Sequence, residues 1–173
     1  QANFVACHQT PFIDRIDMLS MLKPGGVFLL NTPASPDTVW STLPREMQEG
    51  LLEKKAKFFV IDAYKVANDS GLGGRINTVM QACFMSISGV LPPEEAKKAI
   101  QDSIQKAYGR KGEAVVAKNL EALDNTLVAL HEVKLPSKAD GKPRSPAVSP
   151  KAPAFVRAVL AKIYVGNGES LPV

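Results

Sequence analysis

The sequence predicts an α/β domain in which helices cover a mainly parallel sheet, followed by a helical second half. Three short apolar, β-prone runs lie at residues 3–7, 26–31 and 57–62, and helix-like segments separate them. Such alternation joins parallel strands by right-handed crossovers and places the helices on the sheet. The apolar runs lack regular polar alternation, which is typical of strands buried on both faces. Together these observations predict three layers, α/β/α.

The segment between the first two strands predicts a helix. Its apolar residues recur at helical spacing, at Phe12, Ile16, Leu19 and Leu22. The sequence Pro24-Gly25-Gly26 predicts the end of this helix and a turn into the second strand.

A second helix is predicted between the second and third strands. Ser35 suits its N-cap, Pro36 its first position and Asp37 its positive end, while Pro44 predicts a break. Three strands make a thin sheet, and buried parallel strands need neighbours. We therefore expect N-terminal strands of the sheet to be missing here and to lie upstream of Gln1.

The second half predicts three helices. The first follows a glycine loop and has one apolar face; the second runs from Pro93 to Gly109. The third carries a stripe at four–three spacing, formed by Val116, Leu120, Leu123, Leu127 and Leu130. The stripe covers about two heptads, so packing on the domain's own sheet is favoured over a coiled-coil seam. The predicted division is a domain at 1–133, a Pro/Lys-rich linker at 134–152 and a connector at 153–173.

Composition excludes several classes of protein. The chain has 173 residues, a net charge of +4 and two cysteines, which are too few for a disulfide framework or for a zinc or iron–sulfur site within this segment. The basic tract at 134–151 could touch nucleic acid, but its prolines and lack of aromatic residues favour a solvated linker. No apolar run is long enough to span a bilayer. We expect a cytoplasmic protein that binds neither nucleic acid nor membrane.

Polar residues follow all three predicted strands, where ligands bind in open parallel sheets. Cys7 and His8 are adjacent on a strand and point to opposite faces, so a core cysteine and a turn histidine are favoured over a nucleophilic dyad. Asp62 at a strand end could bind a metal or a hydroxyl group. His131 is expected near the negative end of a helix. No catalytic residue and no metal ligand set is predicted.

The glycine loop GLGGRIN, at 71–77, has two open interpretations. Asn77 replaces the third glycine of a Rossmann fingerprint, and the loop does not follow its strand directly, which disfavours dinucleotide binding. The loop could instead present free backbone N–H groups and Arg75 to a phosphate or carboxylate. Alternatively, its glycines form a tight turn that allows close packing of helix on sheet.

Several motifs together carry a resemblance to a known family. GLGGRIN, SGVLP at 88–92 and KAYGRKG at 106–112 stand in the order and spacing of the gamma-type domain of pyruvate:ferredoxin (or flavodoxin) oxidoreductases. The segment at 4–33 is similar to the preceding β-α-β unit of that domain. The resemblance implies a Rossmann-like fold. It also implies a part in the CoA-dependent oxidative decarboxylation of pyruvate to acetyl-CoA and CO2.

The resemblance further implies cofactors and partners. Thiamine diphosphate with Mg2+, [4Fe-4S] clusters and CoA are expected in the whole enzyme, with the thiamine and the clusters held by other domains of a homodimeric chain. Ferredoxin or flavodoxin is the expected electron acceptor. The candidate coenzyme A contacts are Arg75, Asn77, Gly73, Gly74, Asn31 and Thr32. The family's upstream half, with its own glycine-rich segment, is not in this chain, so a complete coenzyme A site is not expected from it alone.

Two alternatives belong to other classes. LSMLKPGGVFLLN, at 19–31, also resembles a strand region of S-adenosylmethionine-dependent methyltransferases, which have no counterpart of GLGGRIN. The leucine stripe alternatively predicts a non-catalytic interaction module.

Overall fold

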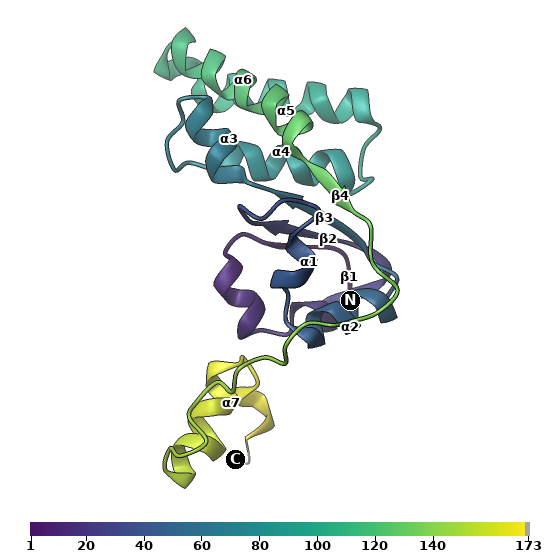
Figure 1. Cartoon of the computed structure of the whole chain (residues 1–173). Helices are drawn as coiled ribbons and strands as arrows, with labels where there is room; N and C mark the ends of the chain where they lie inside the picture. Colours follow the sequence, from purple (N-terminus) through teal and green to yellow (C-terminus); the bar gives the residue numbers. More distant parts are fainter. Residues whose placement is uncertain (172–173) are drawn as a thin grey trace.

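A four-stranded, mainly parallel sheet forms the centre of the computed structural model, which describes residues 1–171 (Figure 1). The strands are β1 (Ala2–Cys7), β2 (Leu22–Asn31), β3 (Lys57–Ile61) and β4 (His131–Val133), in the spatial order β1-β2-β3-β4. β1 pairs with β2 and β2 with β3 in parallel, whereas β4 is antiparallel to β3. The three predicted strands are thereby confirmed, and β4 is an addition that the sequence did not predict.

Helices cover both faces of the sheet, which confirms the predicted three layers. Figure 1 shows α1 (Val39–Thr42) and α2 (Arg45–Glu53) below the sheet. The layer above it contains α3 (Ala63–Asp69), α4 (Asn77–Ile87), α5 (Pro93–Tyr108) and α6 (Glu113–Ala129). β2 supplies both cores, because Phe28 and Leu30 face α1 and α2 while Leu29 faces the upper layer. This double burial explains the unbroken apolar run in its sequence.

The predicted helix between β1 and β2 is wrong. Two short 3-10 helices, Thr10–Asp14 and Met18–Met21, form the crossover, and β2 already begins at Leu22. The Asp17 side chain accepts a hydrogen bond from the Ser20 N–H (3.3 Å), which caps the second of these helices and prevents one continuous helix. Ile13 and Leu19 remain buried, so their apolar spacing reports contact with the sheet rather than an α-helix.

The Pro24-Gly25-Gly26 sequence therefore lies inside a strand rather than after a helix. Gly25 has φ +72°, and its N–H donates to the Lys54 carbonyl (2.7 Å). The pairing register of β1 with β2 shifts between Ala2 and Phe4, beside this irregular stretch. Glycine is required here because the backbone bends through a conformation that other residues rarely adopt.

Pro44 separates α1 from α2, as predicted. The Ser35 carbonyl accepts hydrogen bonds from the N–H groups of Thr38 and Val39, but α1 begins only at Val39, so the predicted N-cap at Ser35 is wrong. A single turn precedes the helix instead. The predicted limits of α5, at Pro93 and Gly109, are confirmed.

The leucine stripe of α6 packs differently from the expectation. Val116, Leu120 and Leu123 pack with α5 and α4, and only the end of the stripe, at Leu130, packs against the core next to the sheet. The reason is that α4 lies between much of α6 and the sheet. Leu123 is 1% exposed, whereas Leu127 is 43% exposed, so the domain covers most of the stripe but not Leu127.

His131 lies near the C-terminal end of α6, as predicted, because it follows the C-cap residue Leu130. It is nevertheless already the first residue of β4 and pairs with Val60. The chain therefore changes from helix to strand within two residues.

Residues beyond β4 run back across α2 to a small helical unit (Figure 1). The N–H groups of Asp140 and Gly141 both donate to Gln48 Oε1 (2.8 Å each), and the Arg45 N–H donates to the Lys142 carbonyl (2.9 Å). Lys134, Lys138 and Lys142 are nevertheless exposed. The backbone of this tract is thus held on the domain while its lysines face water.

Candidate functional site

The carboxyl ends of the three parallel strands are tied together by Asn31. Its Nδ2 donates to the His8 carbonyl (3.1 Å), and its Oδ1 accepts from the Ala63 N–H (2.9 Å). The Thr10 hydroxyl donates to the Asn31 carbonyl (3.0 Å). With 4% of its surface exposed, Asn31 joins the residues that follow β1 and β3 to the end of β2. The structure therefore gives this candidate residue a cross-linking position.

Asn31→Asp is expected to destabilise the fold by about 2 kcal/mol, because a carboxylate oxygen replaces the amide donor and faces the His8 carbonyl. The Ala63 contact can persist, so the loss reports the missing donor. Urea denaturation followed by circular dichroism measures it. Asn167→Asp makes the same chemical change at an exposed site. Equal midpoints for the two variants would contradict the cross-linking role.

A cavity of about 500 Å³ opens beside these strand ends. Thr32, Asp62 and His131 line it from the sheet side, and Asn125 and Val128 line it from α6. The Thr32 hydroxyl accepts from the Ala34 N–H (3.2 Å). Polar residues after β2 and β3 thus share a cavity, whereas no residue that follows β1 lines it.

Asp62 has a structural task at this edge. Its Oδ1 accepts from the Lys65 N–H (2.9 Å) and caps α3, a helix that the sequence did not predict. A carboxylate at a helix N-terminus is stabilised by the free N–H groups there. The cap accounts for this aspartate at the end of β3.

The glycine loop lies between α3 and α4. Gly71 and Gly73 have φ values of +70° and +61°, so the turn itself requires both glycines. A β-carbon at Gly73 or Gly74 would meet nothing within 4 Å. These two positions therefore do not provide close packing of helix on sheet, and their backbone is open to approach from outside.

Arg75 and Asn77 lie at the start of α4, beside the loop, and both are exposed. Arg75 Nε donates to the Leu72 carbonyl (3.1 Å). The two residues line a small cavity of about 40 Å³ together with Leu72, Thr78, Tyr108 and Asn119. Segments that the sequence shows far apart, GLGGRIN, KAYGRKG and the start of α6, thus converge on one place.

A buried hydrogen bond fixes this convergence. The Thr78 hydroxyl donates to Asn119 Oδ1 (2.7 Å), and Asn119 Nδ2 donates to the Val115 carbonyl (2.8 Å). Thr78 and Asn119 are 6% and 3% exposed, so the pair holds α4 against α6 out of contact with water. The position of the loop therefore depends on α6.

The six candidate residues occupy two places rather than one. Asn31 and Thr32 lie at the strand ends, while Arg75 and Asn77 lie at the small cavity, and the two cavities share no lining residue. Gly73 and Gly74 line neither of them. Asn119 and Asn125, one at each cavity, are about 9 Å apart along α6. The sequence did not show this separation, because α3 stands between β3 and the loop.

Sequence reasoning missed Lys118. Its side chain passes Gly71 so closely that a β-carbon there would lie 3.3 Å from Lys118 Cε. It brings a second positive charge to the loop that already carries Arg75. Nothing in the spacing of the sequence joins 71 to 118, so only the packing of α4 on α6 shows this neighbour.

The sequence profile described as "Pyruvate ferredoxin/flavodoxin oxidoreductase" matches residues 1–129, which is most of the chain. The chain belongs to this family. It is 47% identical over its whole length to pyruvate-flavodoxin oxidoreductase from Nostoc sp. and 42% identical to pyruvate:ferredoxin oxidoreductase from Moorella thermoacetica. It spans about 15% of the length of these relatives.

One solved structure has a fold similar to that of this chain. Pyruvate oxidoreductase subunit PORC from Thermotoga maritima matches 78% of this chain and 66% of its own, with a TM-score of 0.60 and 19% identity. The Rossmann-like α/β class expected from the motifs is confirmed. The family assignment favours the oxidoreductase resemblance over the methyltransferase alternative.

The donor groups of this oxidoreductase-family chain do not suit an iron–sulfur cluster. Its two cysteines, Cys7 and Cys83, are buried in separate cores. No three His, Cys, Asp or Glu side chains within residues 1–171 are grouped so as to hold a metal ion. In the same range, no helix has the length and apolar character needed to cross a membrane.

Both thiols are expected to resist modification in the folded protein. Burial raises the pKa of Cys83 to about 12 and also raises the pKa of Cys7, so at pH 8 both remain protonated and unreactive. A disulfide reagent should release chromophore only after urea unfolds the chain, and then from both cysteines. Release from the native chain within minutes would contradict the buried positions.

Proposed function

We propose that this chain is one domain of a longer pyruvate:ferredoxin or flavodoxin oxidoreductase. The enzyme converts pyruvate and CoA to acetyl-CoA and CO2 and passes two electrons to ferredoxin or flavodoxin. The observation that carries the proposal is the identity of 42–47% to such enzymes over the whole chain. Thiamine diphosphate with Mg2+ supplies the chemistry of decarboxylation, and [4Fe-4S] clusters carry the electrons. Both are assigned to other domains of a homodimeric, cytoplasmic enzyme.

The role proposed for this domain is to bind part of coenzyme A at the glycine loop. Free N–H groups at the start of α4 and the guanidinium of Arg75 suit a phosphate. Gly73 and Gly74 leave the backbone open to it, and no side chain caps the helix there. Lys118 adds positive charge from α6. Asn77 is the proposed polar contact in the first turn.

Asn31 and Thr32 enter this proposal at the second place. Thr32 lines the strand-end cavity and is the proposed contact there. Asn31 holds the ends of the strands that shape this edge of the sheet, through its bonds to His8 and Ala63. We therefore assign Asn31 to positioning.

Arg75→Ala in the full-length enzyme is expected to raise the KM for CoA about tenfold, because a charge-assisted contact to phosphate contributes roughly 1.5 kcal/mol. The KM for pyruvate should stay unchanged, since pyruvate reacts elsewhere. Steady-state kinetics with each substrate varied in turn measure both values.

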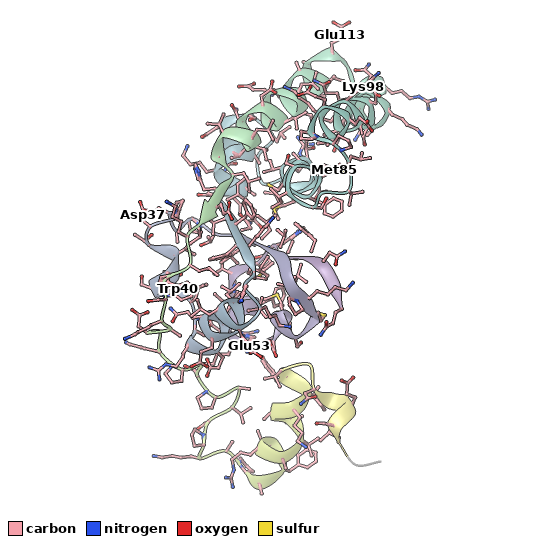
Figure 2. The ribbon with its side chains drawn as sticks, turned by 90° about the vertical axis from the view of Figure 1, so that its right-hand side faces the viewer. Asp37, Trp40, Glu53, Met85, Lys98 and Glu113 are labelled. Atoms are coloured by element: carbon pink, nitrogen blue, oxygen red, sulfur yellow. The ribbon has the colours of Figure 1, made fainter. Side chains whose placement is uncertain are left out.

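Two further variants sharpen this result. Lys98→Ala removes an exposed positive charge on α5 (Figure 2) and should leave both KM values unchanged. Arg75→Lys should retain part of the affinity for CoA because the charge remains while the fork of donors is lost. Unaltered CoA kinetics in Arg75→Ala would remove this residue from the site.

A further inference from the structure

The helical unit at the C-terminal side leaves its apolar side chains exposed or half-buried. It consists of a π-helical turn (Val156–Leu160), α7 (Ala161–Tyr164) and a 3-10 turn (Gly168–Ser170), and none of their residues is buried. Phe155 is 65% exposed, Ile163 53% and Tyr164 58%. Scattered apolar residues are ordinary on a surface, but a cluster on one short unit marks a contact surface.

The apolar residues of this unit share one side of the helix. They recur in pairs four residues apart, at Phe155, Val156, Val159, Leu160, Ile163 and Tyr164. Polar or small residues occupy the remaining positions, at Arg157, Ala158, Ala161 and Lys162. We call the six apolar residues the apolar face. A helix this short is unstable alone in water, so burial of such a face is what stabilises it.

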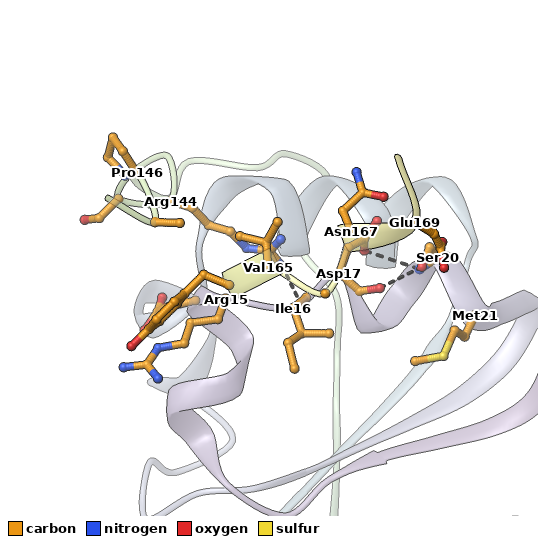
Figure 3. Close-up of a pocket in the computed structure, with 15 residues that line it drawn as sticks. Arg15, Ile16, Asp17, Ser20, Met21, Arg144, Pro146, Val165, Asn167 and Glu169 are labelled. Atoms are coloured by element: carbon orange, nitrogen blue, oxygen red, sulfur yellow. Dashed lines mark hydrogen bonds between the residues drawn. The ribbon is translucent and has the colours of Figure 1, made fainter. Parts of the chain in front are cut away.

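The rest of the described chain covers the unit poorly. The guanidinium of Arg15 lies over the ring of Tyr164, 5.5 Å from its centroid, at the solvent-exposed end of the apolar face. A cavity of about 920 Å³ lies between the domain and the unit (Figure 3). One side is lined by residues 14–17, Ser20, Met21 and the tract at 144–147, and the other by residues 164–167 and Glu169. Charged residues from both sides line it, so it does not bury the apolar face.

The tract that leads to the unit is fixed on the domain. The Arg144 N–H donates to the Glu46 carboxylate (3.0 and 3.2 Å), and Arg144 Nη2 donates to the Ile16 carbonyl (3.3 Å). Gly141 is held by Gln48 shortly before it. The apolar face is therefore presented from an anchored segment.

The comparisons indicate what lies against the apolar face. The family profile ends at residue 129, yet the long relatives match 100% of this chain, including the helical unit. This chain makes up only about 15% of their length, so most of each relative lies outside it. The helical unit is therefore matched by the long enzymes, although it lies outside the residues that the family profile matches.

We propose that the apolar face docks on another domain of the same polypeptide. This rests on the proposed function, in which the chain is one domain of a long oxidoreductase. Six side chains bury much less than the roughly 800 Å² per partner of a stable interface between separate proteins. A tethered domain needs less area, because the shared chain raises its effective concentration.

Photo-crosslinking in the full-length enzyme tests the proposal. Tyr164→p-benzoylphenylalanine places a photoreactive ring on the apolar face, and Ala158→p-benzoylphenylalanine places it on the opposite side as a control. The expected product is an intramolecular cross-link from position 164 to a peptide outside residues 1–171. Its yield should be at least about tenfold higher than from position 158, because cross-linking needs contact within roughly 4 Å.

Other products would overturn the proposal. The first is a cross-link from position 164 to a second copy, which would appear as a band of doubled mass. The second is a set of cross-links confined to residues 1–171. The third is an equal yield from positions 164 and 158. Pyruvate oxidation by each variant is measured in parallel. An active enzyme without the expected cross-link refutes the docking alone. The expected cross-link in a protein that does not oxidise pyruvate refutes the proposed function alone.

Discussion

Gln48→Leu is expected to lower the free energy of unfolding by about 3 kcal/mol, because three backbone groups, two of them buried, lose the side chain that bonds them. Gln48 is fully buried on α2, and its Nε2 donates to the Trp40 carbonyl (2.7 Å). Its Oε1 accepts from the N–H groups of Asp140 and Gly141. Leucine has a similar size but can replace none of these bonds. The tract beyond β4 should therefore loosen at Asp140 and Gly141, while Arg144 remains bonded to Glu46.

Urea denaturation measures this loss, with the fluorescence of Trp40 as the signal. Trp40 is the only tryptophan in the chain, is 8% exposed and contacts Gln48 directly. Gln101→Leu makes the same substitution at an exposed position on α5 and should change the midpoint little. A loss below about 1 kcal/mol would mean that water satisfies the three backbone groups.

Gly26→Ala is expected to cost about 2–3 kcal/mol through overpacking between β1 and β2. A β-carbon at Gly26 would lie 2.9 Å from the Lys23 carbonyl oxygen and 3.0 Å from the Asn3 carbonyl oxygen. Both are backbone atoms, so the two strands must move apart to accept the methyl group. Hydrogen exchange at the β1 amides should accelerate more than exchange at β3.

Gly168→Ala is the matched control for this substitution. Its β-carbon would meet only Ile163 Cγ1, at the ordinary distance of 3.7 Å. The control should unfold at the urea concentration of the unchanged chain. Equal stability of the Gly26 and Gly168 variants would show that the start of β2 yields without cost, contrary to the close contacts seen here.

The sequence predicted the central strands well because their physics is local. β2 and β3 contribute buried residues to the cores on both faces, and β1 contributes half-buried ones; this packing appears in the sequence as apolar runs. β4 was not predicted because three residues are too few to show a strand pattern. Its antiparallel pairing with β3 also depends on the tertiary fold rather than on the local sequence. The segment between β1 and β2 was wrongly predicted as one α-helix. Apolar residues spaced three or four apart are compatible with two 3-10 helices as well as with one α-helix.

The candidate site was predictable only in part. The strand ends and the glycine loop both stand out in the sequence, and the structure places Asn31 and Thr32 at the first and Arg75 and Asn77 at the second. Their separation depends on α3, a short helix with no strong sequence pattern. The presence of Tyr108 and Lys118 beside the loop depends on how α5 and α6 pack, which periodicity does not encode.

The two margins of the sheet differ in how well they could accept a further strand. β4 offers three residues, and two of them, His131 and Glu132, are exposed polar residues that discourage a further neighbour. β1 lies at the opposite margin, runs for six residues and is paired on one side. The margin at β1 therefore favours the addition of strands to this sheet more than the margin at β4 does.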